Sequence, residues 1–165
     1  MEFDQYDTPR ARWIVLHEYG EVMGGVRLMP TTSVCAQYSY MLRDAQLGML
    51  PDIPQDVLFF KAPVRDDIWE ATRLFLTSAV PAQRRIAVQR MLMNQMAGAA
   101  YAMGASHVLG IVPATFSRWM TRLGLMSAVP VGPVQNIDGD RTQAALMNVS
   151  YIGEMTPTES THTLH

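Results

Sequence analysis

The segment Ile68-Trp69-Glu70-Ala71-Thr72-Arg73-Leu74-Phe75-Leu76 decides how this sequence is interpreted. Most of its side chains are apolar, which predicts a buried strand, yet it carries a carboxylate and a guanidinium three residues apart. Ionised side chains are rarely buried unless they are paired or take part in function. Residues three apart on a regular strand face opposite sides of the sheet. Glu70 and Arg73 therefore share one cleft only if a β-bulge re-aims one of them, which we favour; otherwise Arg73 supports the site from behind.

Two other segments combine charged and apolar side chains in the same way. Residues 2–7 read Glu-Phe-Asp-Gln-Tyr-Asp, and residues 25–32 read Gly-Val-Arg-Leu-Met-Pro-Thr-Thr. Alternating side chains predict a β-hairpin whose strands cover residues 10–17 and 22–29. In the second strand Arg27 faces away from its apolar neighbours, which is compatible with solvent exposure or with an ion pair.

The middle of the chain is the least regular part of the sequence. Pro51, Pro54 and Pro63 interrupt it, so we expect only one short helix, within residues 42–50. The apolar run at residues 57–60 is compatible with a strand or with a buried loop.

The second half has clearer periodicity. After the strand at residues 68–76 we expect a helix over 81–103, a strand at 107–112, a helix at 114–123 and a strand at 143–149. Pro81 suits the start of the long helix and Gly104 its end. The strand–helix–strand order predicts a parallel pair with a right-handed crossover. Asp138-Gly139 predicts a hairpin turn before the last strand.

Composition excludes several classes of protein. The 165 residues carry a formal net charge of −2, which argues against a nucleic-acid partner. Cys35 is the only cysteine, so no disulfide framework forms within one chain, and a reducing cytoplasm is expected. The four histidines lack metal-ligand spacing, so no metal is expected. No run approaches the roughly 20 apolar residues of a membrane span.

Four ordered motifs carry a family resemblance. They are Asp4 with Tyr6 and Asp7, the run from Gly24 to Thr32, Tyr40-Met41-Leu42, and Trp69-Glu70 with Arg73. In this order they resemble the acyl-homoserine-lactone synthases, the bacterial autoinducer synthases. The resemblance implies an α/β, acetyltransferase-like (GNAT-like) fold with a mixed, mostly antiparallel sheet flanked by helices. It also implies one domain over residues 1–155, without an upstream family segment that helps enclose the substrate, and a flexible tail over 156–165.

The resemblance also implies a two-step reaction. The amine of S-adenosylmethionine attacks an acyl thioester, and the methionyl carboxylate then closes a lactone and releases methylthioadenosine. No cofactor is held permanently, because S-adenosylmethionine is a substrate. Glu70 is the candidate general base; the alternative is a structural partner for an arginine. Other candidate site residues are Arg27 and Arg73, which would hold the acidic cluster and the substrate carboxylate, Asp4 and Asp7, which would balance the substrate's positive charges, and Trp69 and Phe75, which would contact substrate.

The connection at residues 77–83 bears on the acyl donor. It contains no glycine, whereas a loop that cradles the pyrophosphate of coenzyme A is rich in glycine. We therefore expect acyl carrier protein as the partner that brings the acyl group, its arm lying in a cleft between the strands that end near Phe75 and begin near His107. Basic side chains would dock this acidic protein, namely Arg84, Arg85, Arg90, Arg118 and Arg122.

Two other functions fit the same residues. The chain could be an N-acyltransferase that acts on another amine. It could also be a non-catalytic binding module that offers a methionine-rich surface to a partner, since 13 of its residues are methionine.

Overall fold

The N-terminal hairpin forms as the alternation predicts. The computed structural model describes residues 4–116, 118, 120 and 127–150. Strands β1 (Arg12–Glu18) and β2 (Glu21–Pro30) pair antiparallel, with Arg12 opposite Leu28 and Glu18 opposite Glu21. Tyr19 and Gly20 join them with φ angles of 51° and 80°, a conformation that glycine adopts readily.

The central strands form the expected parallel unit. Strand β3 (Ile68–Leu76) pairs antiparallel with β2 and parallel with β4 (His107–Pro113). The crossover between them contains a 3₁₀ turn (Ala82–Arg84) and helix α2 (Arg85–Ala102). Helix α1 (Met41–Gln46) is the short helix expected in the middle of the chain.

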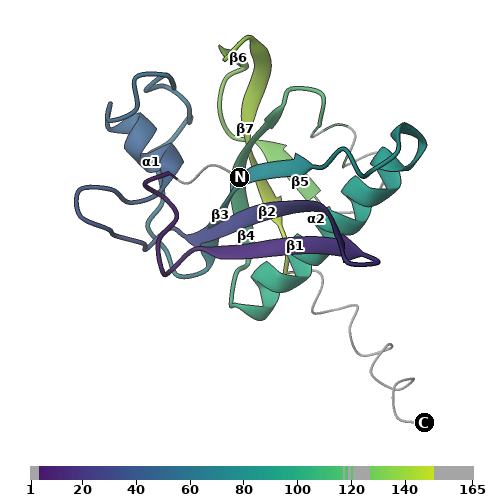
Figure 1. Cartoon of the computed structure of the whole chain (residues 1–165). Helices are drawn as coiled ribbons and strands as arrows, with labels where there is room; N and C mark the ends of the chain where they lie inside the picture. The colour runs from purple at the N-terminus through teal and green to yellow at the C-terminus, as the bar shows by residue number, and fades with distance from the viewer. Residues whose placement is uncertain (1–3, 117, 119, 121–126, 151–165) are drawn as a thin grey trace.

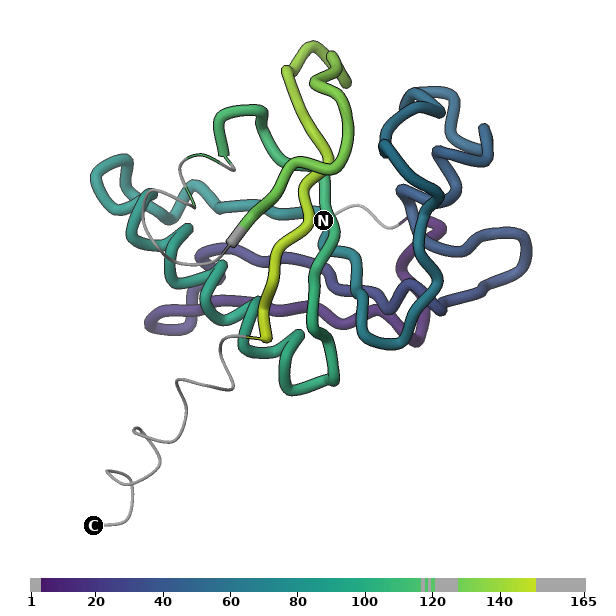
Figure 2. Tube along the Cα trace, turned by 180° about the vertical axis from the view of Figure 1, so that it is seen from behind, coloured from purple at the N-terminus to yellow at the C-terminus, as the bar shows by residue number. Residues whose placement is uncertain are grey.

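Three further strands complete the sheet. Strand β7 (Asp140–Asn148) pairs antiparallel with β4, β5 (Ser127–Pro130) and β6 (Gln135–Ile137). The described residues thus form a seven-stranded, mostly antiparallel sheet in the order β1-β2-β3-β4-β7-β5, with β6 on β7. Asp138-Gly139 forms the predicted turn, with φ angles of 51° and 83°. Figures 1 and 2 both show the β6–β7 hairpin projecting beyond the body of the sheet.

Some sequence-based predictions need correction or remain outside the described residues. Residues 57–60 form no strand; Val57 and Leu58 are buried, while the backbone N–H of Phe59 donates to Val131 O. Strand β5 was not predicted. Of the helix expected at 114–123, Phe116, Arg118 and Met120 are helical and much of the remainder lies outside the described residues. The tail at 156–165 also lies outside them.

The two faces of the sheet bury separate apolar clusters. Helix α2 covers the face that presents Val26, Leu28 and Val108, and its own Leu92 and Met96 are fully buried there. Helix α1 and its flanking loops cover the other face around Met29 and Leu109. Figure 1 shows α1 and α2 at different ends of the sheet. No helix among the described residues is long and apolar enough to cross a membrane.

Two irregularities of β3 shape the site. The ladder with β4 consists of four residue pairs, from Ile68–His107 to Ala71–Gly110, and beyond it the two strands separate. The ladder with β2 shifts register between the pairs Gly25–Phe75 and Arg27–Thr72, so β3 contains one extra residue there. Arg73 has a φ of 58°, which places the predicted β-bulge at this residue.

Candidate functional site

A tight turn presents two carboxylates to the sheet. The backbone N–H of Asp7 donates to Asp4 O at 3.1 Å, and the Asp7 carboxylate accepts the N–H of Asp4 at 2.8 Å. The N–H of Tyr6 donates to Asp4 Oδ1 at 2.9 Å. These bonds fix both aspartates before any contact with the strands is made, as is usual for side chains that bond their own turn.

Arg27 is buried beneath this turn. Its side chain is only 1% exposed, so the possibility that it points to solvent is excluded. Nη1 donates to Asp4 Oδ1 at 2.7 Å and to Asp7 Oδ1 at 3.2 Å, and Nε donates to Thr72 Oγ1 at 3.0 Å. Its guanidinium also lies 5.8 Å from the ring centre of Tyr6. The cost of burying this cation is offset by these contacts.

The bulge brings Arg73 to the same carboxylate. Arg73 Nε and Nη2 donate to Asp4 Oδ2 at 3.1 and 2.6 Å. Burial acts to raise the pKa of Asp4, but the hydrogen bonds from Arg27 and Arg73 outweigh it, so the pKa lies below its ordinary value. The structure thus brings Asp4, Asp7, Arg27 and Arg73 together, but Glu70, which we expected to share a cleft with Arg73, is not among them.

Glu70 occupies a different position from these four residues. It is buried, and its Oε1 and Oε2 accept the backbone N–H groups of Met41 and Leu42 at 3.1 and 2.8 Å. Desolvation raises its pKa to about 7, although these two N–H groups and the charge of Arg27 act in the opposite direction. The bonded partner of Glu70 is thus the start of α1 rather than Arg27, and Glu70 does not line the cavity described below.

A second buried carboxylate was not predicted. Asp44 is fully buried on α1 and accepts hydrogen bonds from Tyr6 Oη at 2.9 Å, Ser39 Oγ at 2.6 Å and Ser39 N at 3.1 Å. Burial and this bond raise the pKa of Tyr6. No signal in the sequence marked it, because Asp44 lies in a short helix that also contains Arg43 and Gln46. The contact ties α1 to the acidic turn.

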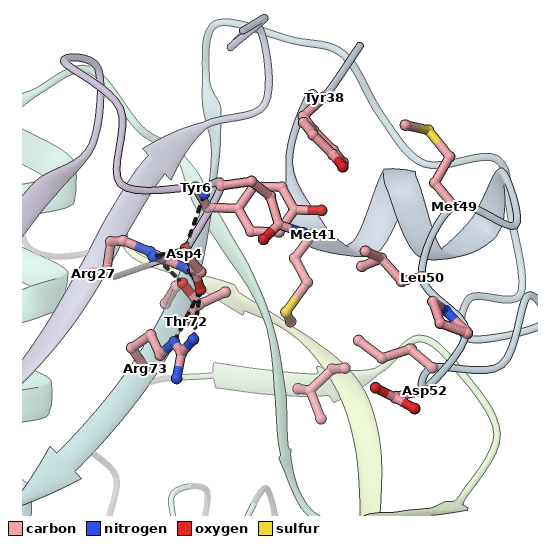
Figure 3. A pocket seen from close by; sticks show the side chains of 15 residues that line it. Asp4, Tyr6, Arg27, Tyr38, Met41, Met49, Leu50, Asp52, Thr72 and Arg73 are labelled. Carbon is pink, nitrogen blue, oxygen red and sulfur yellow. Dashed lines mark hydrogen bonds and ion pairs between the residues drawn. The ribbon is translucent and has the colours of Figure 1, made fainter. Parts of the chain in front are cut away.

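These elements enclose a cavity of about 560 Å³, the first cavity. One end is formed by Asp4, Arg27 and Arg73, and the other by Tyr38, Leu50 and Asp52, as Figure 3 shows. Two predicted substrate-binding residues do not line it. Trp69 belongs to the core beneath α2, and Phe75 packs edge-on against Trp13 with ring centres 6.3 Å apart.

A smaller cavity lies where β3 and β4 separate. This splay cavity has a volume of about 60 Å³ and is lined by Val26, Leu74, Met96, Val112, Phe116 and Met147, among others. It shares Ala71, Thr72, Arg73 and Ile111 with the first cavity, so the two adjoin at the bulge. The expected cleft therefore exists, but it begins beyond Gly110; near His107 the strands are paired.

The predicted docking arginines differ in their surroundings. Arg84 forms a two-bond ion pair with Glu18, at 2.9 and 2.8 Å. Arg85, Arg90 and Arg118 are exposed, and Arg122 lies outside the described residues. Of the predicted docking arginines, Arg85, Arg90 and Arg118 are thus exposed and could meet an acidic partner.

Curated relatives named as synthases are similar to most of this chain. The acyl-homoserine-lactone synthase of Pseudomonas aeruginosa is 27% identical over 139 residues, which cover 84% of this chain and 60% of the relative. The synthase of Aeromonas salmonicida is 28% identical over 148 residues, 83% of this chain and 65% of the relative. The chain thus spans 60 to 65% of the length of these curated relatives.

Solved structures confirm the acetyltransferase-like fold. TofI in its apo form superposes with a TM-score of 0.71 at 25% identity, over 90% of this chain and 73% of that one. BjaI, described as a coenzyme-A-dependent acyl-homoserine lactone synthase and solved with S-adenosylmethionine and isopentyl-CoA, gives 0.65 at 22% identity, over 90% and 63%. A Lactobacillus plantarum protein assigned as an N-acetyltransferase gives 0.55 at 14%, over 89% and 75%.

The family model described as autoinducer synthase matches residues 1–151. This match covers the acidic turn, the whole sheet and both cavities. The chain therefore belongs to the autoinducer synthase family.

Proposed function

We propose that this protein makes an acyl-homoserine lactone from S-adenosylmethionine and an acyl thioester. The observation that carries the proposal is the junction of two cavities at the bulge of β3. A charged cavity suited to an amino acid there meets a narrow apolar cavity suited to an acyl chain. Placing an amine beside a thioester in this way converts a reaction between two molecules into an intramolecular one. The relatives named as synthases support the same reaction.

The charged end of the first cavity has distinct proposed roles. Asp4 and Asp7 hold Arg27, and Asp4 also orients Arg73, through the ion pairs described above. The two arginines and two aspartates balance one another in charge, so this end of the cavity has no excess charge of either sign to oppose the ammonium or the carboxylate of an amino acid. Arg73, which lines both cavities, is the proposed contact for the methionyl carboxylate.

The role of Glu70 as general base stays a prediction, and the geometry constrains it. A pKa of about 7 suits a group that accepts a proton near neutral pH. Glu70 does not line the first cavity, however, so a proton would have to reach it through a water molecule. If Glu70 is a general base, the Glu70→Gln variant should change the shape of the pH profile of turnover. If Glu70 only holds Met41 in the cavity wall, turnover should fall and the shape of the pH profile should not change.

Acyl carrier protein is the proposed donor, on the grounds of the glycine-free connection before α2 and the exposed arginines that follow it. Since BjaI is described as coenzyme-A-dependent, the donor needs a direct test. Turnover with acyl carrier protein should exceed that with the matching acyl-CoA. Reversing Arg85 and Arg90 to glutamate should weaken the carrier-protein reaction most at low salt, since these charges act mainly on association. Reversing the exposed Arg141 on β7 is the matched control.

The reaction itself is tested by mass spectrometry. Purified protein supplied with S-adenosylmethionine and an acyl thioester should release an acyl-homoserine lactone and an equal amount of methylthioadenosine. Another acylated amine would instead support the alternative N-acyltransferase, and the absence of any acylated product would support the binding module. Because the proposed substrates are cytoplasmic metabolites, the reaction is expected in the cytoplasm.

A further inference from the structure

The junction of the two cavities fixes the direction in which a substrate must lie. Ala71, Thr72, Arg73 and Ile111 line both cavities, so an amine that attacks an acyl group must sit at this end of the first cavity. S-adenosylmethionine carries its amine and its nucleoside at opposite ends. The nucleoside must therefore extend toward the end formed by the loop after α1, where Leu50 and Asp52 lie (Figure 3).

That far end has several apolar side chains in its wall. Met41, Met49, Leu50 and Ile53 supply apolar atoms, which suits the faces of a purine. Leu50 to Ile53 form a β-turn closed by the Ile53 N–H donating to Leu50 O at 3.3 Å, and Pro51 occupies the position where proline favours such a turn. Asp52 follows Pro51 and is therefore held at the tip of the turn.

The carboxylate of Asp52 has no bonded partner in the part of the chain that the structure describes. Asp4, the other carboxylate among the described lining residues, is joined to two arginines. Aspartate is common in turns, which explains the residue type at position 52. A turn does not require that carboxylate to line a cavity, so turn formation does not explain why Asp52 does. An ionised carboxylate at this place can accept two hydrogen bonds from a vicinal diol, as acidic residues do from ribose in dinucleotide sites.

We propose that Asp52 binds the ribose hydroxyls of the nucleoside substrate and so selects for an intact ribose. This inference rests on the proposed function, because it takes S-adenosylmethionine as the occupant of the first cavity. The proposed function alone does not say which part of the substrate Asp52 contacts. Here Asp52 binds the neutral sugar rather than the sulfonium or the ammonium group.

Calorimetric titration of the whole chain with three ligands tests this assignment. The ligands are S-adenosylmethionine, methylthioadenosine, which keeps the ribose but carries no positive charge, and 2′,3′-dideoxy-methylthioadenosine. The Asp52→Asn variant should bind S-adenosylmethionine and methylthioadenosine about tenfold more weakly than the wild type does. It should bind the dideoxy ligand with the same affinity as the wild type. Asp66→Asn, which removes an exposed carboxylate that does not line the cavity, should change none of the three affinities.

Three results would overturn the inference. A loss confined to S-adenosylmethionine would show that Asp52 binds the positive charge rather than the ribose. Unchanged affinities in Asp52→Asn, with the wild type binding normally, would remove Asp52 from the site while leaving the proposed function intact. A wild-type protein that binds none of the three ligands would refute the proposed function and this inference together. Because Asp52 is exposed on a turn, the folding of the variant can be verified by an unchanged thermal melt.

Discussion

Replacing Glu70 by glutamine should change how stability depends on pH. The pKa of Glu70 is raised from 4.5 to about 7, chiefly by desolvation. Between these two values the folded protein keeps a proton that the unfolded chain has released, so stability falls as pH rises through this window. One pKa unit corresponds to about 1.4 kcal/mol, so the loss between pH 4.5 and pH 7 is about 3 kcal/mol in free energy of unfolding.

Glutamine is a close match for the protonated acid. Neither carries a charge, but the NH2 group of glutamine cannot accept from a backbone N–H, so the variant loses one of the two bonds from Met41 and Leu42. This cost is the same at every pH and cancels when the pH dependence of the two proteins is compared. At pH 8 the wild type carries the cost of a buried charge and the variant does not. The Glu70→Gln variant should therefore gain about 3 kcal/mol relative to the wild type from pH 5 to pH 8.

Urea denaturation at pH 5, 6, 7 and 8 measures this difference directly, because titrations of all other groups cancel between the two proteins. Glu21→Gln, an exposed glutamate in the hairpin, is the control and should give a flat difference. If the difference in free energy of unfolding between Glu70→Gln and the wild type does not change with pH, Glu70 is not desolvated as described. A variant that loses relative stability as pH rises would show that Arg27 and the N–H groups of α1 outweigh desolvation.

Other substitutions test the acidic turn and the bulge by the same denaturation assay. Arg27→Met leaves two carboxylates without their buried partner and should cost about 3 kcal/mol, the lower end of the range for such pairs, since Asp4 is 18% exposed; a cost below 1 kcal/mol would contradict the burial argument. Gly24→Ala should destabilise by roughly 1–3 kcal/mol, because its Cβ would lie 2.6 Å from Phe75 O, whereas Gly98→Ala, with open space in α2, should stabilise by about 1 kcal/mol. Tyr6→Phe removes a donor from buried Asp44 and should cost roughly 1–3 kcal/mol; a neutral result would mean that water replaces the hydroxyl.

Local signals were enough to predict much of the fold. The hairpin, β3, α2, β4 and the Asp138-Gly139 turn each have alternation, a long helical segment or a turn pair in the sequence. Strand β5 has none of these: it is four residues long, ends in Pro130 and is defined by its pairing with β7. Residues 57–60 show the reverse case, because the sequence has an apolar run there and the structure has a loop instead of a strand.

The candidate site was predictable only where side chains meet side chains. Asp4, Asp7, Arg27 and Arg73 have opposite charges and ordered motifs, and these indicated that they converge. The partners of Glu70 are backbone N–H groups, which every residue except proline carries, so no residue type in the sequence points to them. Asp52 was missed for a similar reason, because a turn explains its residue type and only the cavity reveals its surroundings.

The bulge at Arg73 also reverses which positions of strand β3 face each side of the sheet. Before it, Thr72 lies on the side of Arg27, to which it is bonded, while Ala71 packs with the core beneath α2. After it, Phe75 lies on the side of Arg27 and Leu76 joins the α2 core, so odd and even positions have traded faces. A one-residue deletion in this stretch would remove the bulge and leave Phe75 opposite Gly25, still on the side of Arg27. Strand β3 thus lines both cavities because it has one residue more than β2 at the bulge.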